Sequence, residues 1–403
     1  MLPASSKKAA IYGSALLSAA MLLPAVNIAR ADAPPEHAVV AMRFLNYRDR
    51  QSGDTEITRG MTRDRITVNA LTVDAKVPLA GSWLIGTTFV EDSVTGASPA
   101  YHSGGFPKAP AGPDAVSGAS GELRHAGDLS VTRYFAKGSL SGGLSYSRES
   151  DYISRGYSLQ GSISTEDKNT TFTIGAGFND DTIDLNRPAV VASKRQVPDE
   201  KKHVFTALFG LTRVCTKDDI VQLNFGYTNG NGYYSDPYKD PDKRPGLRNV
   251  STVMTRWNHY FRSTEGTTRL SYRYYSDTFG IRAHTLDAEY VQPLHRGWTV
   301  TPLFRLYSQN EADFYVASNT ASPADPVPVP PGTPCYSEDQ RLSSFGALTL
   351  GMKVGRELGR NWHAEAEYEH YQQRGSWSIN GHGDPGVATF MARFVQLGVS
   401  REF

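Results

Sequence analysis

The sequence predicts an all-β protein, a transmembrane outer-membrane β-barrel of about 16 antiparallel up-and-down strands, with short periplasmic turns and long extracellular loops. Three observations predict this fold. The N-terminus resembles a secretory signal, segments of alternating apolar and polar residues recur along the chain, and short and long connections alternate between them. The segment ending at Phe403 alternates too: Val395, Leu397 and Val399 share one face with Phe403, and the other face is mostly polar.

The N-terminal segment indicates export. Two lysines precede an apolar run over residues 9–26, and a small-residue cleavage site follows just before Asp32. This is the arrangement of a signal peptide, and a retained membrane anchor is the alternative. We therefore expect a cleaved signal at 1–31 and a single barrel domain at 32–403.

Alternation with a period of two marks the strands. In residues 139–147, for example, leucine, glycine and tyrosine alternate with serine and glycine. A small polar face of this kind suits a barrel lumen, although a soluble β-sandwich would alternate as well. We expect sixteen strands, with fourteen or eighteen as alternatives, starting near residues 38, 65, 83, 122, 139, 152, 171, 202, 220, 249, 268, 281, 298, 341, 362 and 389.

The lengths of the connections favour the barrel over the sandwich. Every connection after an even-numbered strand is short, which predicts periplasmic turns at 78–82, 136–138, 166–170, 216–219, 263–267, 293–297 and 355–361. Most connections after odd-numbered strands are long, which predicts exterior loops at 50–64, 93–121, 185–201, 230–248, 317–340 and 374–388. This asymmetry between the two ends is typical of outer-membrane barrels.

Aromatic residues gather near the ends of the expected strands. Trp83, Trp298 and Trp362 each follow a short turn, as expected of an interfacial girdle. Phe403 is the expected membrane-insertion signal, recognised by the outer-membrane assembly machinery. Arg401 interrupts the apolar face beside it, so we expect this side chain at the level of the lipid headgroups.

Composition and motifs exclude several functions. A formal net charge of +1 argues against nucleic acid, which requires a basic patch. The sequence lacks the nucleophile elbow, the H-E-x-x-H zinc motif, C-x-x-C and the phosphate-binding loop, so no enzyme activity is expected.

The penultimate strand carries the clearest lumenal pattern. Its acids alternate with alanine and tyrosine, and charges facing lipid are costly, so the acids should face the lumen. The same parity places several cations there. We expect these residues to set selectivity from opposed acidic and basic walls, or alternatively to form salt bridges that plug or stiffen a narrow barrel: Glu365, Glu367, Glu369, Arg256, Arg273, Arg305 and Lys353.

Carboxylates also recur at the long-loop ends of several strands. Converging carboxylates and hydroxyls could hold Ca²⁺ or Mg²⁺ at the extracellular rim, or bind lipopolysaccharide through divalent ions. The alternative is ordinary turn chemistry, which favours Asp and Ser. The candidates are Asp92, Asp151, Asp181 and Asp277.

Four stretches resemble a bacterial outer-membrane family known as domain of unknown function 3570. Residues 92–99 resemble its D-x-V-S/T-G-A-S-P motif, and residues 148–152, 233–239 and 275–285 are similar to other family segments. Phe279 stands where relatives are expected to have Trp. The resemblance covers nearly all the mature chain and implies an outer-membrane barrel without a known activity. It also suggests periplasmic redox proteins as partners.

Three functions remain open. The leading hypothesis is a channel or conduit for small solutes or ions. The second is a non-porous barrel that acts as an anchor, a receptor or the partner of a periplasmic redox system, and the third is an enzyme. Strand parity places Cys215 at a short turn and Cys335 in a long loop, so we expect two free thiols at opposite ends of the barrel.

Overall fold

The computed structural model describes residues 34–52, 64–79, 81–96, 122–184, 198–236, 242–317, 332–359, 361–379, 383–384 and 386–403. The expected signal peptide lies outside these residues, as does most of the 93–121, 185–201 and 317–340 loops. The described part contains no helix long and apolar enough to cross a bilayer.

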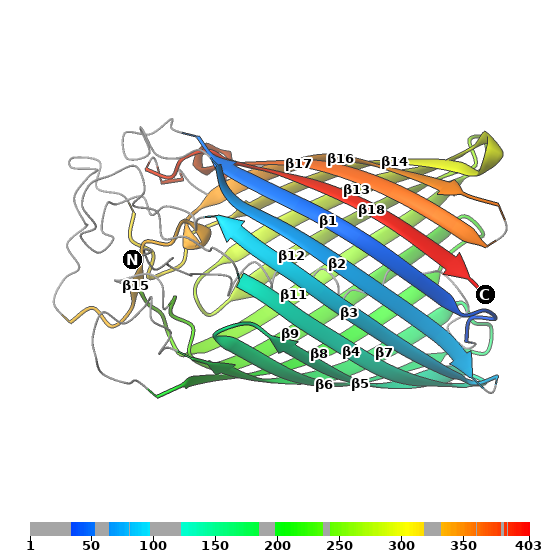
Figure 1. The fold of residues 1–403 in the computed structure, drawn as a ribbon, viewed down its shortest axis with the longest axis horizontal. Coiled ribbons are helices and arrows are strands. Elements are labelled where there is room, and N and C mark those ends of the chain that lie inside the picture. Colours follow the sequence, from blue (N-terminus) through cyan, green and yellow to red (C-terminus); the bar gives the residue numbers. More distant parts are fainter. Residues whose placement is uncertain are drawn as a thin grey trace, which may run out of the picture.

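The strands form one closed antiparallel barrel (Figure 1). Sixteen strands make its wall, as predicted, and each pairs with its neighbours in the chain until β1 pairs with β18. They are β1 (Val39–Gln51), β2 (Asp64–Leu79), β3 (Trp83–Gly96), β4 (Glu122–Phe135), β5 (Gly138–Arg148), β6 (Tyr152–Ser164), β7 (Thr170–Ile183), β8 (Glu200–Val214), β9 (Asp219–Gly232), β11 (Leu247–Phe261), β12 (Gly266–Asp277), β13 (Arg282–Leu294), β14 (Trp298–Gln309), β16 (Phe345–Glu357), β17 (Trp362–Arg374) and β18 (Phe390–Glu402).

The observed strands begin close to the expected positions, with one exception. The strand expected near residue 341 begins at Phe345, because a 3₁₀ turn, η2 (Gln340–Leu342), precedes it. Two further strands, β10 (Asp242–Lys243) and β15 (Tyr336–Ser337), pair with each other outside the wall. The sequence did not predict them, since a strand of two residues is too short to show an alternation of apolar and polar residues.

The two faces of the wall differ as the alternation predicts. On the outer face, Leu159, Ile163 and Ile174 are 57%, 60% and 69% exposed. Because lipid offers no hydrogen bonds, the wall has to satisfy its own backbone groups, and closure of β1 on β18 leaves no bare edge.

The two ends of the barrel also differ. All the connections at the end near the C-terminus are short, and the longer segments lie at the end that carries β15 (Figure 1). At the short-turn end, arginines stack on the three expected tryptophans. The guanidinium carbons of Arg133, Arg356 and Arg401 lie 5.1, 4.7 and 5.3 Å from the ring centres of Trp83, Trp298 and Trp362. Such pairs suit the headgroup region, the level expected for Arg401.

Candidate functional site: the lumen and its extracellular bridge

One row of the lumen wall, toward the short-turn end of the strands, carries only small residues, most of them polar. Ser139, Ser162, Thr173, Gly210 and Asn224 lie opposite one another in register across β5 to β9. Neighbouring hydroxyls bond to each other, as Ser139 Oγ and Ser162 Oγ do at 2.8 Å. Short side chains occupy little of the lumen, so this wall leaves room for water or a solute.

The charged residues lie on the other part of the wall, and their arrangement differs from one expectation. Lys353 Nζ lies 3.1 Å from Glu367 Oε2 on the neighbouring strand, and Arg43 Nε donates to Glu365 Oε1 at 3.2 Å. Arg305 Nε donates to Asp287 Oδ1. For Glu365, Glu367, Arg305 and Lys353 the structure therefore shows salt bridges along one wall, which is the alternative to acids and bases that face each other across the lumen.

Three of the lumenal candidates lack such an ion pair. Glu369 lies opposite Gly351 in the β16–β17 register. Arg256 lies opposite Ser271, and Arg273 opposite Met254, in the β11–β12 register. Arg273 Nη2 donates only to the hydroxyl of Thr285, at 3.5 Å, and within the described ranges Arg256 and Arg273 make no salt bridge. Parity alone could not predict that Arg305 forms an ion pair while these two arginines do not, because ion pairing depends on the register between neighbouring strands.

The structure does not gather the four rim carboxylates expected to bind a cation. Each of three has its own cationic partner: Arg124 Nη2 lies 2.6 Å from Asp92, Lys202 Nζ lies 3.2 Å from Asp181, and Arg248 Nη2 lies 2.6 Å from Asp277. Asp151 is buried at the β5–β6 turn. Across the described segments, no group of three or more acidic, histidine or cysteine side chains could hold a metal ion. Local pairing with a basic neighbour explains Asp92, Asp181 and Asp277.

A segment of the β14–β16 connection, residues 336–344, bridges the mouth of the barrel at its long-loop end. At one end of this bridge, Gln51 Nε2 at the end of β1 donates to Gln340 Oε1 at 3.5 Å. At the other, β15 pairs with β10, in the connection that follows β9. In the closed barrel, β1 and β9 are eight strands apart and thus on opposite sides of the ring. The bridge and the β10 connection together span the opening.

Buried ion pairs hold the bridge in place. The Asp339 carboxylate is fully buried and accepts from Arg244 Nη2 at 2.9 Å and from Arg341 Nε at 2.7 Å. Arg244 Nε also donates to Asp242 at 2.8 Å, and Arg341 Nη2 to Asp236 at 2.9 Å. Each guanidinium thus joins a bridge carboxylate to one from the β9–β11 connection. Sequence reasoning missed all five residues, since loop contacts leave no periodic signal.

The electrostatics reflect this burial. Burial raises the pKa of the Asp242 carboxyl, although the charge of Arg244 and the hydrogen bonds from Arg244 and Ser337 oppose the rise. Burial also raises the pKa of Tyr233 to about 12, and the charges of Asp236 and Asp242 add to the effect. The Tyr233 phenol is therefore neutral at physiological pH.

An apolar cluster lies beneath the bridge. Phe279, in the β12–β13 turn, is 1% exposed and packs with Ile281, Ala312 and Leu342. Its ring meets Phe314 edge-on, with centroids 5.0 Å apart. Phe279 is the position where the family resemblance leads us to expect Trp, so the residue that departs from the family pattern is a packing residue of the bridge.

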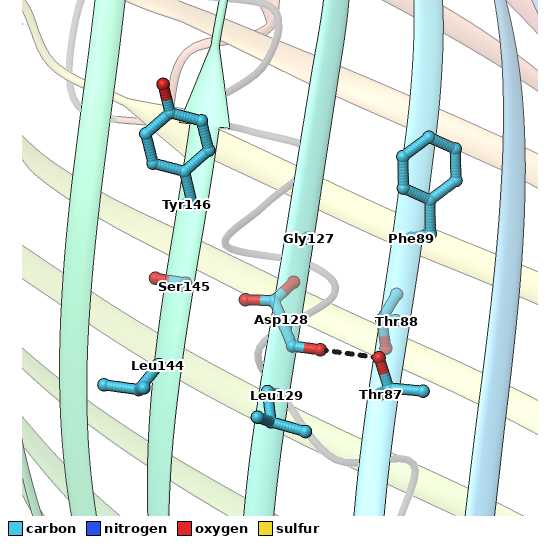
Figure 2. Close-up of a pocket in the computed structure, with 9 residues that line it drawn as sticks. All are labelled: Thr87, Thr88, Phe89, Gly127, Asp128, Leu129, Leu144, Ser145 and Tyr146. Atoms are coloured by element: carbon cyan, nitrogen blue, oxygen red, sulfur yellow. Dashed lines mark hydrogen bonds between the residues drawn. The ribbon is translucent and has the colours of Figure 1, made fainter.

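A depression of about 370 Å³ in the wall between β3, β4 and β5 carries no polar chemistry directed at a ligand (Figure 2). Its outer lining is Phe89, Leu129, Leu144 and Tyr146, around the missing side chain of Gly127. Thr87 Oγ1 donates to the backbone oxygen of Asp128 at 3.1 Å. Because the apolar lining belongs to the outer face, lipid chains would fill this depression.

The two cysteines lie at opposite ends of the barrel and are free, as strand parity predicted. Cys215 is exposed at the β8–β9 turn, where its N–H donates to the Asp219 oxygen at 2.9 Å. Cys335 is partly buried and directly precedes β15.

Solved barrels that resemble this structure have low identity. A bacterial polysaccharide outer membrane secretin is 10% identical, with a TM-score of 0.49 and coverage of 91% of this chain and 98% of that one. A BenF-like porin from Pseudomonas fluorescens Pf-5 is 10% identical, with a TM-score of 0.45 and the same coverage. A FadL homologue from Pseudomonas aeruginosa is 10% identical, with a TM-score of 0.42 and coverage of 91% and 90%. Values this low say nothing about function.

No curated protein matches the sequence. The family model described as protein of unknown function DUF3570 matches residues 13–394, nearly the whole chain, so the chain belongs to that family.

Proposed function

We propose that this protein is an outer-membrane channel for small polar solutes or ions, with an extracellular mouth narrowed by the bridge. The observation that carries the proposal is the row of small polar residues facing the lumen from β5 to β9. Side chains fill the lumen of an eight-stranded barrel, whereas barrels of sixteen strands leave an aqueous channel. Short side chains on one wall widen that channel further.

The bridge favours the second candidate, a barrel that is closed in its resting state and serves as a receptor or as the partner of a periplasmic redox system. Its carboxylates and guanidiniums are fixed by several charge-assisted hydrogen bonds, and such a cluster favours one conformation. The two candidates differ in whether solutes cross the purified barrel.

Planar-bilayer recording of the purified protein separates them, and two glycines offer a matched pair of variants. A side chain added at the lumenal Gly175 would meet neighbours at ordinary contact distances of 3.7–3.8 Å, and at the lipid-facing Gly142 it would meet nothing within 4 Å. If solutes cross the lumen, Gly175→Trp should lower single-channel conductance, while Gly142→Trp should leave it unchanged. No conductance from the wild type, or from a variant with a weakened bridge, would reject the channel.

A further inference from the structure

We propose that Arg256, Arg269 and Arg273 form a binding site for small oxyanions, such as phosphate-class solutes, on the lumen wall between β11 and β12. The inference rests on the proposed function in one respect, namely that solutes reach the lumen. It adds a solute class and a site to that function.

The register brings the three arginines together. Arg256 lies opposite Ser271, and Arg269 and Arg273 are the residues two positions to either side of Ser271 on β12. Diagonal neighbours of this kind have Cα atoms about 7–8 Å apart, within easy reach of long side chains. Parity directs all three side chains to the lumen, so three guanidiniums share one patch.

Two carboxylates on β13, Glu289 opposite Arg269 and Asp287 opposite Ser271, offset only part of the charge of this patch. Arg269 Nη1 has a long contact of 3.5 Å with Glu289 Oε2, and both side chains are largely open to the lumen, at 48% and 37% exposure. Asp287 accepts from Ser271 Oγ at 3.3 Å, but Arg305 already occupies its other oxygen. The neighbouring β9 residue is Gln222, which lies opposite Arg256 and adds an amide instead of a charge.

Three like charges in one patch repel one another, and an anion between them removes that cost. Guanidinium is the group best suited to oxyanions, because its fork of N–H donors matches two oxygens at once. Such a patch in a lumen would bind phosphate-class anions in preference to chloride, and would slow their passage. The adjacent wall of small polar residues leaves space for the ligand.

The experiment uses inorganic pyrophosphate as the probe, in two arms. In bilayers, pyrophosphate should block chloride current through the wild type. Arg256→Gln and Arg273→Gln should each weaken that block about tenfold, the loss expected for about one charge-assisted contact. Arg256→Lys should keep the preference of the channel for chloride over cations, because the positive charge remains. It should weaken the block by pyrophosphate, because lysine lacks the forked N–H donors of guanidinium. A Lys137→Gln, Glu166→Gln double variant, which removes an exposed ion pair at a short turn without changing net charge, should behave as wild type.

In the second arm, calorimetry measures pyrophosphate binding to the detergent-solubilised barrel, with heat-modifiable gel mobility as the check that each variant is folded. Binding that is lost in the two Gln variants, in a protein that conducts nothing, would support the site and reject the channel. A conducting protein that neither binds pyrophosphate nor is blocked by it would overturn the oxyanion site and leave the channel intact.

Discussion

Asp339→Asn should release the extracellular bridge while leaving the barrel wall folded. The variant keeps the shape of the side chain but removes the charge that accepts from Arg244 and Arg341. Breaking a buried pair by removing one partner costs about 3–5 kcal/mol. The lower end applies here, because Arg244 keeps Asp242 and Arg341 keeps Asp236. About 3 kcal/mol corresponds to an increase of about a hundredfold in the population of the undocked bridge.

Hydrogen exchange followed by mass spectrometry measures this population directly. Peptides covering residues 336–344 should exchange about a hundredfold faster in the variant, and peptides from the wall should be unchanged. The matched control is Glu166→Gln, which removes an exposed acid paired with Lys137 at 2.8 Å near the β6–β7 turn, at the short-turn end. An exposed pair contributes about 0–1 kcal/mol, so exchange of the bridge should not respond. Unchanged exchange of the bridge in a folded Asp339→Asn barrel would refute the role given to the buried ion pairs.

Three further predictions concern topology, charge and the thiols. Epitope tags within 93–121, 185–201 or 317–340 should be labelled on intact cells, and a tag at 216–219 should not; equal labelling would overturn the orientation. The Gln variant of the three glutamates on β17 should shift the reversal potential toward anions, since it leaves Lys353 without its acid and Arg43 with Asp74 alone; an unchanged potential in a conducting protein would remove these acids from selectivity. An impermeant maleimide should label Cys335 on whole cells and spare Cys215, and the reverse pattern would contradict the parity of the strands between them.

Strand number, parity and the difference between the two ends of the barrel could all be predicted from the sequence, because each depends on a period of two or on the length of a connection. For Glu367, the sequence predicted the face of the strand but not the ion-pair partner. Its alternation with alanine predicted a lumenal side chain, but only the β16–β17 register shows that Lys353 lies directly opposite. Register between strands depends on closure of the whole ring, which no single segment contains.

The bridge was beyond prediction for a different reason. Asp339 meets Arg244 across 95 positions of sequence, and both belong to segments without periodic pattern. Local propensity predicts a turn in each of these segments. It does not predict which two turns contact each other in the fold. The rim aspartates show the converse error, since a recurring motif suggested a shared cation site, whereas Asp92, Asp181 and Asp277 each have a nearby basic partner of their own.

Closure of β1 on β18 has a consequence for biogenesis. Val39 lies opposite Glu402, so the seam joins residues separated by nearly the whole described chain. Until that seam forms, the nascent sheet has two bare edges, and neither can enter lipid without unpaired backbone groups. Contacts so distant in sequence form slowly, and the partly assembled sheet is exposed to aggregation in the meantime. Insertion therefore has to be coupled to closure, and a factor that shields the two edges would be expected to set the rate at which this barrel matures.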